Sequence, residues 1–208
     1  MSRLRHLNRS TTLVALLVFA GCAELAYQHM NDPARDAWQK PKAVIQALVI
    51  SPGARVADLG AGGGYFTWPL AEAVGPDGKV YAMDINETGL RMIEQDAKAR
   101  AVTNVKPVLA TPTDAKLPET VDLVFNCDTY HHMSDRVAYF RSLASHLRDD
   151  GRVAILDFHK TGFFSGVLGH GTSKELIRQE MEAAGYRLVA EHSFLQDQHF
   201  QIIAVSRP

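Results

Sequence analysis

From residue 43 onward, short apolar runs alternate along the chain with longer stretches in which apolar positions recur at helical spacing. The apolar runs predict five strands, at 55–60, 79–84, 104–110, 121–128 and 152–158. The amphipathic stretches predict a helix over about 65–74, a second that Asn86 caps and that ends near Arg100, and a third that Ser134 caps. Such alternation is typical of βαβ units in a doubly wound parallel sheet.

The third of these helices has Val137, Phe140, Leu143, Ala144 and Leu147 on one face. The "DDG" at 149–151 then predicts a turn that leads into the fifth strand.

The C-terminal part has a different pattern. Thr172 and Glu175 predict a capping box for a helix to about Ala184, and Gly185 ends it. The β-rich runs at 186–194 and 199–207 are separated by four residues, a connection that permits an antiparallel hairpin and is too short for a parallel crossover. The predicted fold is therefore α/β, with a mostly parallel seven-stranded sheet whose last strand is antiparallel.

The first 22 residues have the pattern of a secretory signal peptide. Three arginines with no acid precede an apolar run over 13–21 that is shorter than the ~20 residues a membrane span needs. The "FAGC" at 19–22 resembles the bacterial lipoprotein signal box, with Phe19 where that box usually has Leu. The resemblance implies lipid on Cys22. An uncleaved N-terminal anchor, a mis-assigned start and a domain facing the cytoplasm are the alternatives.

This interpretation divides the chain into a signal peptide at 1–21, a lipidated N-terminus and tether at 22–42, and a domain at 43–208. Pro33 and Pro41 are expected to break any long helix in the tether. The expected location is the periplasmic side of the cell envelope, with the chain anchored to a membrane by lipid.

Composition and charge narrow the function further. With 208 residues, 46% hydrophobic and 22% charged, the chain is typical of one globular domain. The formal net charge is −1, and it becomes −4 without residues 1–21, which argues against a nucleic-acid partner bound by bulk electrostatics. If Cys22 carries lipid, Cys127 is left without a disulfide partner.

The stretch "VADLGAGGGYF" at 56–66 places a glycine-rich turn between a predicted strand and a predicted helix. Glycine removes side chains that would block a ligand from main-chain N–H groups. A dinucleotide-binding turn has glycine at its sixth position, but the sixth residue counted from Gly60 is Tyr65. The glycines at 60, 62 and 64, with Asp58 two residues earlier, instead resemble motif I of the class I S-adenosylmethionine-dependent methyltransferases.

The resemblance covers roughly residues 36–207 and implies S-adenosylmethionine as cofactor. Asp58 and free N–H groups of the loop would serve the ammonium and carboxylate of its methionine end. Asp84 would accept from both ribose hydroxyls, and Asp114 in "TDAKLP" would accept from the adenine amine. The residues implied for cofactor binding are Asp58, Gly60, Ala61, Gly62, Gly64, Tyr65, Asp84, Ile85, Thr113, Asp114 and Asp128.

Catalytic residues are expected beyond the carboxyl ends of the fourth and fifth strands. The candidates there are Asp128, Tyr130, His131, His132, Asp157 and His159, with His132 as first choice for a general base and Asp128 beside it. A packing role is the alternative for each of these side chains. The acids and histidines among these, together with His170, could form a metal site, but no helical His-x-x-x-His or Cys pair supports one, and no metal is expected.

The apolar, glycine-rich loop at 160–172 carries Phe163, Phe164, Val167 and Leu168, which could cover an apolar acceptor, touch a bilayer or pack onto the core. No added domain that would recognise a macromolecule is expected. The sequence therefore predicts methyl transfer to a small, apolar or lipid-like acceptor, by a chain tethered to a membrane of the cell envelope. The alternative is a non-catalytic methyltransferase-like protein that binds a nucleoside-type ligand there.

Overall fold

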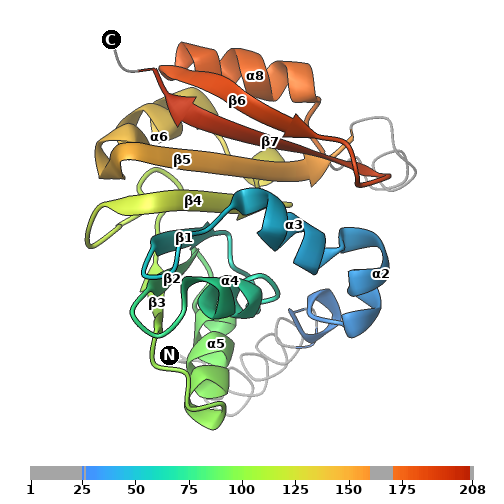
Figure 1. The fold of residues 1–208 in the computed structure, drawn as a ribbon, viewed down its shortest axis with the longest axis vertical. Coiled ribbons are helices and arrows are strands. Elements are labelled where there is room, and N and C mark those ends of the chain that lie inside the picture. Colours follow the sequence, from blue (N-terminus) through green and yellow to red (C-terminus); the bar gives the residue numbers. More distant parts are fainter. Residues whose placement is uncertain (1–24, 26, 160–170, 207–208) are drawn as a thin grey trace, which may run out of the picture.

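A computed structural model describes residue 25, residues 27–159 and residues 171–206, and these form a seven-stranded sheet between two layers of helices (Figure 1). The strand order is β3-β2-β1-β4-β5-β7-β6. Strand β7 is antiparallel to both of its neighbours and the other pairs are parallel, so the predicted fold class is confirmed. The strands are β1 (Arg55–Leu59), β2 (Lys79–Asp84), β3 (Val105–Leu109), β4 (Val121–Cys127), β5 (Leu147–Phe158), β6 (Tyr186–His192) and β7 (Gln198–Val205).

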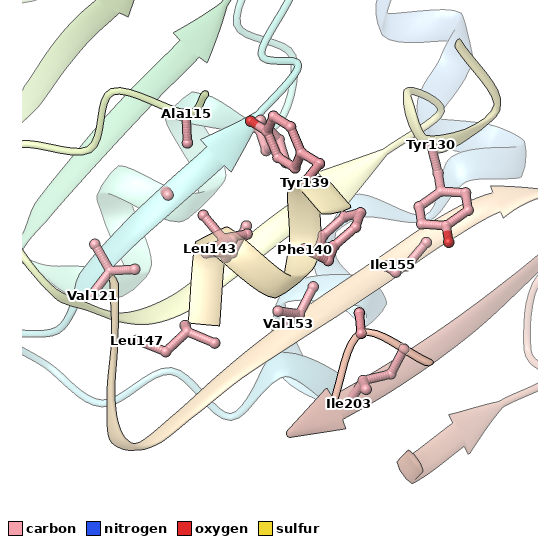
Figure 2. Close-up of a cluster of buried hydrophobic side chains, with 14 of the residues drawn as sticks. Ala115, Val121, Tyr130, Tyr139, Phe140, Leu143, Leu147, Val153, Ile155 and Ile203 are labelled. Atoms are coloured by element: carbon pink, nitrogen blue, oxygen red, sulfur yellow. The ribbon is translucent and has the colours of Figure 1, made fainter. Parts of the chain in front are cut away.

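The helices cover the two faces of the sheet, because neighbouring strand residues point to opposite sides. Val56 packs in a cluster with α3 and α4, whereas Ala57 packs in a cluster with α6 and α8. Figure 2 shows Phe140 and Leu143 of α6 over Val153 of β5. The helices are α2 (Asp36–Gln39), α3 (Pro41–Leu48), α4 (Thr67–Val74), α5 (Glu87–Ala99), α6 (Arg136–Leu143) and α8 (Lys174–Ala183), with short 3₁₀ turns η1 (Pro33–Arg35), η2 (Tyr130–His132) and η3 (Ala144–His146).

Two of the three predicted helix caps differ from the structure by one residue. Asn86 caps α5 as predicted, with its side chain accepting from the Thr88 N–H. Helix α6 is capped by Asp135 and α8 by Ser173, whose oxygens reach the N–H groups of Ala138 and Leu176. Ser134 and Asp135, like Thr172 and Ser173, can each serve as a helix cap. In the structure the second residue of each pair accepts from the free N–H of the first helical turn.

Helix and strand limits differ as well. Helix α4 begins at Thr67, two residues later than predicted. Helix α6 ends at Leu143, so the predicted apolar face of that helix continues into η3 and β5. The "DDG" lies inside β5, at an irregularity in its pairing with β4, and does not form a turn before it.

The predicted tether at 22–42 is helical and packed in the part that the structure describes. Residues 27–30 are helical, and η1 and α2 follow. The two prolines interrupt the helical segment as expected: η1 begins at Pro33, and α2 ends at Gln39 before α3 begins at Pro41. The fixed φ of proline suits the first turn of a helix. The signal peptide and Cys22 lie outside the described residues. Within the described residues, no helix has the length and apolar character that crossing a bilayer requires.

A partly buried polar contact joins α6 to α8. The Glu180 carboxylate receives two hydrogen bonds of 2.8 Å from the Arg136 guanidinium and one of 2.7 Å from the Tyr130 hydroxyl. Burial raises the pKa of Glu180, but the hydrogen bonds from Arg136 and Tyr130 outweigh burial and hold the pKa below its usual value. Tyr130, one of the candidate catalytic residues, is fully buried by this contact and serves the core.

We expect Glu180→Gln to lower the free energy of unfolding by about 2 kcal/mol at pH 7, somewhat less than breaking a fully buried pair costs. The folded pKa lies below the unfolded one, so the stabilisation is present above the unfolded value of about 4.3 and is lost as pH falls through the folded pKa. Urea unfolding at pH 7 and pH 3.5 measures the difference, which should shrink at the lower pH. Glu94→Gln, which breaks the exposed pair with Lys98, is the matched control and should change stability by less than about 0.5 kcal/mol.

Candidate functional site

The glycine loop follows β1 at the carboxyl edge of the sheet. Gly60, Gly62 and Gly64 have φ of 82°, 54° and 95°, which other residues rarely adopt. A Cβ on Gly60 would lie 2.2 Å from the Thr129 Oγ1, so the loop after β4 packs directly against this glycine. The backbone therefore requires glycine here on both conformational and steric grounds.

Four of the loop N–H groups are already used within the protein. Those of Gly60 and Ala61 donate to the Met83 carbonyl at 2.8 and 2.9 Å, and that of Gly64 donates to the Ala61 carbonyl at 2.9 Å. The Gly62 N–H donates to the Asp84 carboxylate at 2.9 Å. For these four N–H groups the expectation that they are free for a ligand carboxylate is wrong, because β2 and the loop itself satisfy them.

Two predicted acids lie beside the loop in different surroundings. Asp84 is half-buried at the end of β2 and accepts from the Gly62 and Asn86 N–H groups. Asp58 is buried and accepts from the Thr67 hydroxyl at 2.7 Å. Burial, with the charge of Asp84 added, raises the pKa of Asp58 to about 7. A cation bound next to Asp58 would favour its ionised form.

A cavity of about 100 Å³ lies between the glycine loop and the carboxyl end of β4. The predicted residues that line it are Asp58, Gly60, Ala61, Gly62, Tyr65 and Asp128. Gly64, also predicted, does not line it, and Thr129, which the sequence did not single out, does. Asp128 pairs with Arg35 at 2.7 Å and accepts from the Gln198 side-chain amide. Burial raises the pKa of Asp128 to about 6, against the opposing effect of the Arg35 charge.

The segment before α3 covers this cavity. The Tyr27 ring would be 3.5 Å from a Cβ on Gly62, and the Asn31 amide donates to the Gly63 carbonyl at 2.6 Å. Met30 and Arg35 complete the cover. The contacts link residues more than thirty positions apart, so no local pattern could reveal them. The one sequence signal was the Arg, Asp and Trp at 35, 36 and 38, which are unusual in a flexible tether.

The structure does not bring Thr113 and Asp114 into this cavity. They line a separate small hollow beside Tyr139 and Ser142 of α6. The Asp114 carboxylate accepts from the Lys116 N–H at 2.8 Å and pairs with its ammonium at 2.8 Å, which lowers the Asp114 pKa. Ile85, directly after Asp84, is 62% exposed and presents an apolar surface beside the loop.

The carboxyl ends of β4 and β5 hold a histidine–aspartate pair. The His131 Nδ1 lies 2.6 Å from the Asp157 Oδ1, and Asp157 is fully buried. The N–H of Asp128, which lines the cavity, donates at 2.9 Å to the carbonyl of Leu156, the residue before Asp157, so the pair lies beside the cavity. His132, the first choice from sequence, is exposed next to His131, with their ring centroids 4.1 Å apart.

The remaining candidates contribute little to this geometry. His159 stacks near His199, with ring centroids 5.5 Å apart. His170 and the apolar loop side chains Phe163, Phe164, Val167 and Leu168 lie outside the described residues. Within the described ranges, no group of three or more His, Cys, Asp or Glu side chains is arranged to hold a metal ion.

A larger hollow of about 400 Å³ lies at the opposite edge of the sheet, lined by residues 49–54, Asp122, Arg148 and Arg152. It borders the amino ends of the strands. Open α/β sheets bind their ligands at the carboxyl ends, where strand order reverses, and here β1 and β4 form that point. The smaller cavity is therefore the better candidate.

Comparison with known proteins agrees with this geometry. A protein-family model described as "Methyltransferase domain" matches residues 50–203. The chain belongs to the methyltransferase domain family. The match covers the strands from β1 through most of β7, and with them the glycine loop, Asp84 and the His131–Asp157 pair.

Curated relatives of this methyltransferase domain act in quinone biosynthesis, by their names. The demethylmenaquinone methyltransferase of Geobacillus stearothermophilus is 37% identical over 82 residues, which is 39% of this chain and 34% of the relative. The ubiquinone/menaquinone biosynthesis C-methyltransferase UbiE of Burkholderia mallei is 34% identical over 144 residues, which is 64% of this chain and 56% of the relative. The chain thus spans between a third and just over half of these relatives.

Solved structures share the fold of this methyltransferase domain. A SAM-dependent methyltransferase from Aquifex aeolicus has a TM-score of 0.82 at 23% identity and covers 88% of this chain and 98% of its own. Magnesium protoporphyrin IX methyltransferase from Synechocystis PCC 6803, with bound SAH, has a TM-score of 0.65 at 22% identity. The match covers 82% of this chain and 83% of that protein.

The residues of the site fit S-adenosylmethionine in chemistry. The cofactor carries an ammonium and a sulfonium, and the cavity and its border hold Asp58, Asp84 and Asp128 against one lining arginine among the described residues. The fit in volume is partial. About 100 Å³ is below the roughly 300–1,000 Å³ typical of ligand sites, because the segment before α3 covers the loop.

Proposed function

We propose that this methyltransferase domain transfers a methyl group from S-adenosylmethionine to a small, apolar acceptor. The observation that carries the proposal is the placement of two unlike sites at one sheet edge. The glycine loop with Asp84 lies at the ends of β1 and β2, and the His131–Asp157 pair lies at the ends of β4 and β5. One site suits a nucleoside and the other suits proton transfer.

The cofactor-side residues have separate roles in this proposal. Asp84 accepts the ribose hydroxyls, and the exposed face of Ile85 packs on the adenine ring. Asp58 lies in the wall of the same cavity, and the acids together stabilise a positively charged ligand. When bound, S-adenosylmethionine supplies a methyl group on a positively charged sulfur, open to in-line displacement. The protein's contribution is then mainly to hold the two reactants in line.

The acceptor-side pair can hold and move a proton. With Asp157 ionised, the His131 Nδ1–H donates to it, and the neutral ring then carries its lone pair on Nε2. The imidazole can take the proton of a hydroxyl on the acceptor, which makes the acceptor more nucleophilic. The names of the curated relatives support a hydroxylated aromatic ring of the quinol type as the acceptor class.

Two measurements on the purified full chain test the proposal. Calorimetric titration with S-adenosylmethionine and S-adenosylhomocysteine should show saturable binding at one site per chain. Label should then pass from methyl-labelled cofactor to demethylmenaquinol or to 1,4-dihydroxy-2-naphthoic acid. Binding without transfer to either acceptor would favour the non-catalytic nucleoside-binding alternative, and no binding by folded protein would reject both.

We also propose that Cys22 carries lipid. The lipid would anchor the domain to a membrane of the cell envelope, on the periplasmic side. The arginines of residues 1–9, the apolar run at 13–21 and the "FAGC" box support this location. It implies a supply of S-adenosylmethionine outside the cytoplasm, which makes the location a separate proposal from the activity.

We expect Cys22→Ala to move the chain from the membrane fraction to the soluble fraction, because the lipid is the anchor in this proposal. Cell fractionation with immunoblotting measures the shift. Cys127→Ala removes the other cysteine and should leave the fractionation unchanged. A topology reporter fused after Pro208 that is active in the cytoplasm would overturn the proposed location.

A further inference from the structure

Arg35 is the one basic side chain among the described residues that line the cavity. It comes from η1, within the segment that the sequence predicts as a tether. Its guanidinium pairs with Asp128 at 2.7 Å, and the two side chains are 17% and 16% exposed. A segment outside the matched family region thus places a positive charge in the proposed cofactor site.

The guanidinium is held from several sides. Its Nε donates to the Gln39 side chain at 3.1 Å, and its Nη1 donates to the Met30 carbonyl at 3.1 Å. It stacks on the Tyr65 ring, with the guanidinium carbon 4.3 Å from the ring centroid. Arginine has five N–H donors, so this group keeps capacity for a further acceptor while its position stays fixed.

The Asp128 partner is held in a similar way. One carboxylate oxygen accepts from Arg35 and the other from the Gln198 amide, which also accepts from Gln39 at 2.7 Å. Asp128 has φ of 52°, in the left-handed region. The structure therefore fixes one cation and one anion next to each other, facing the same cavity.

Four N–H groups of the glycine loop are already used within the protein. The N–H groups of Gly60, Ala61 and Gly64 donate to main-chain carbonyls, and that of Gly62 donates to Asp84. The other charged group of the cavity wall, Asp58, would repel a carboxylate. A ligand with an amino-acid end brings both a carboxylate and an ammonium, and the Arg35–Asp128 pair presents the complementary charges.

We propose that Arg35 binds the carboxylate at the methionine end of the cofactor and that Asp128 faces its ammonium, so that the zwitterion inserts into their ion pair. This inference rests on the proposed function. It makes Arg35 a specificity-determining residue, which distinguishes cofactor and product from nucleosides that lack the amino-acid end. It also assigns Asp128 to binding and not to proton transfer.

The test compares two ligands that differ in the amino-acid end. S-adenosylhomocysteine has the carboxylate and ammonium, and 5′-methylthioadenosine lacks both. We expect Arg35→Gln in the full chain to weaken S-adenosylhomocysteine binding roughly 10- to 100-fold, the range for losing a hydrogen bond to a charged group, and to leave methylthioadenosine binding within about twofold. Arg35→Lys keeps the positive charge but lacks the paired donors of the planar guanidinium. Its affinity for S-adenosylhomocysteine should lie between those of the wild type and Arg35→Gln.

Arg100→Gln is the matched control, because Arg100 also stacks on an aromatic ring and pairs with a carboxylate, but caps the C-terminal end of α5 and does not line the cavity. It should bind both ligands as the wild type does. Equal affinity of wild type and Arg35→Gln for S-adenosylhomocysteine would overturn the inference, as would an equal loss for both ligands. If Arg35→Gln does not fold, the affinities of Arg35→Lys for the two ligands provide the test. A wild type that binds neither ligand would reject the proposed function and this inference with it.

Discussion

Replacing His131 with Gln should lower the kcat of methyl transfer by about 10²- to 10⁴-fold, the usual contribution of a general base. The expected cause is the loss of the imidazole that Asp157 orients at 2.6 Å. Affinity for S-adenosylhomocysteine should change less than about threefold, because the pair lies beyond the cofactor cavity. Turnover of demethylmenaquinol and calorimetry together separate the two effects.

Asp157→Asn tests whether the Asp157 carboxylate orients the His131 ring. It should lower kcat nearly as far as His131→Gln, and the double variant should be little worse than either single one, because residues that act as a unit are not additive. Urea unfolding must show that the variants remain folded, since the Asp157 carboxylate also accepts from the Phe158 N–H. His132→Gln is the adjacent control. A large loss in His132→Gln with none in His131→Gln would reverse the assignment.

Asp84→Ala should weaken S-adenosylhomocysteine binding by roughly 10²- to 10³-fold, because two charge-assisted hydrogen bonds to the ribose would be lost. A second cause adds to the first. The Gly62 N–H loses its acceptor, so the loop is less firmly held. The methylthioadenosine affinity should fall in parallel, since the ribose is common to both ligands, and this separates Asp84 from Arg35.

The matched control for Asp84 is Asp96→Ala, which removes a half-exposed carboxylate from α5. It should bind both ligands as the wild type does. If Asp84→Ala bound S-adenosylhomocysteine within about threefold of the wild type, the ribose assignment would be rejected, and the site would need a different ligand.

Local patterns were sufficient for most of the fold. Alternating apolar runs located the strands, and the four-residue connection at 195–198 was enough to reverse β7. The limits of elements were less predictable. Ser134 and Asp135, or Thr172 and Ser173, are equivalent as caps on chemical grounds, and the choice between them depends on how the following helix packs.

Contacts of the site that lie within one strand–turn–helix unit could be predicted from the sequence. Contacts between parts of the chain that are far apart in sequence could not. Asp58, Asp84 and the glycines lie within or beside one strand–turn–helix unit, and they meet as expected. His131 and His132 are neighbours in sequence, and the turn η2 determines which one reaches Asp157. Arg35 reaches Asp128 across 93 positions, and composition alone suggested a tether there.

The hydrogen bonds inside the glycine loop bear on the entropy of ligand binding. An unfolded glycine has more conformational freedom than any other residue, and in this protein folding itself removes it. Gly89 of α5 reinforces this, because a Cβ there would lie 2.3 Å from the Gly62 carbonyl oxygen, so helix and loop are in direct backbone contact. The loop is therefore ordered before any ligand arrives. A nucleoside that binds beside the loop would meet Tyr27 and Asn31, which already contact it, but it would not have to order the backbone on which it binds.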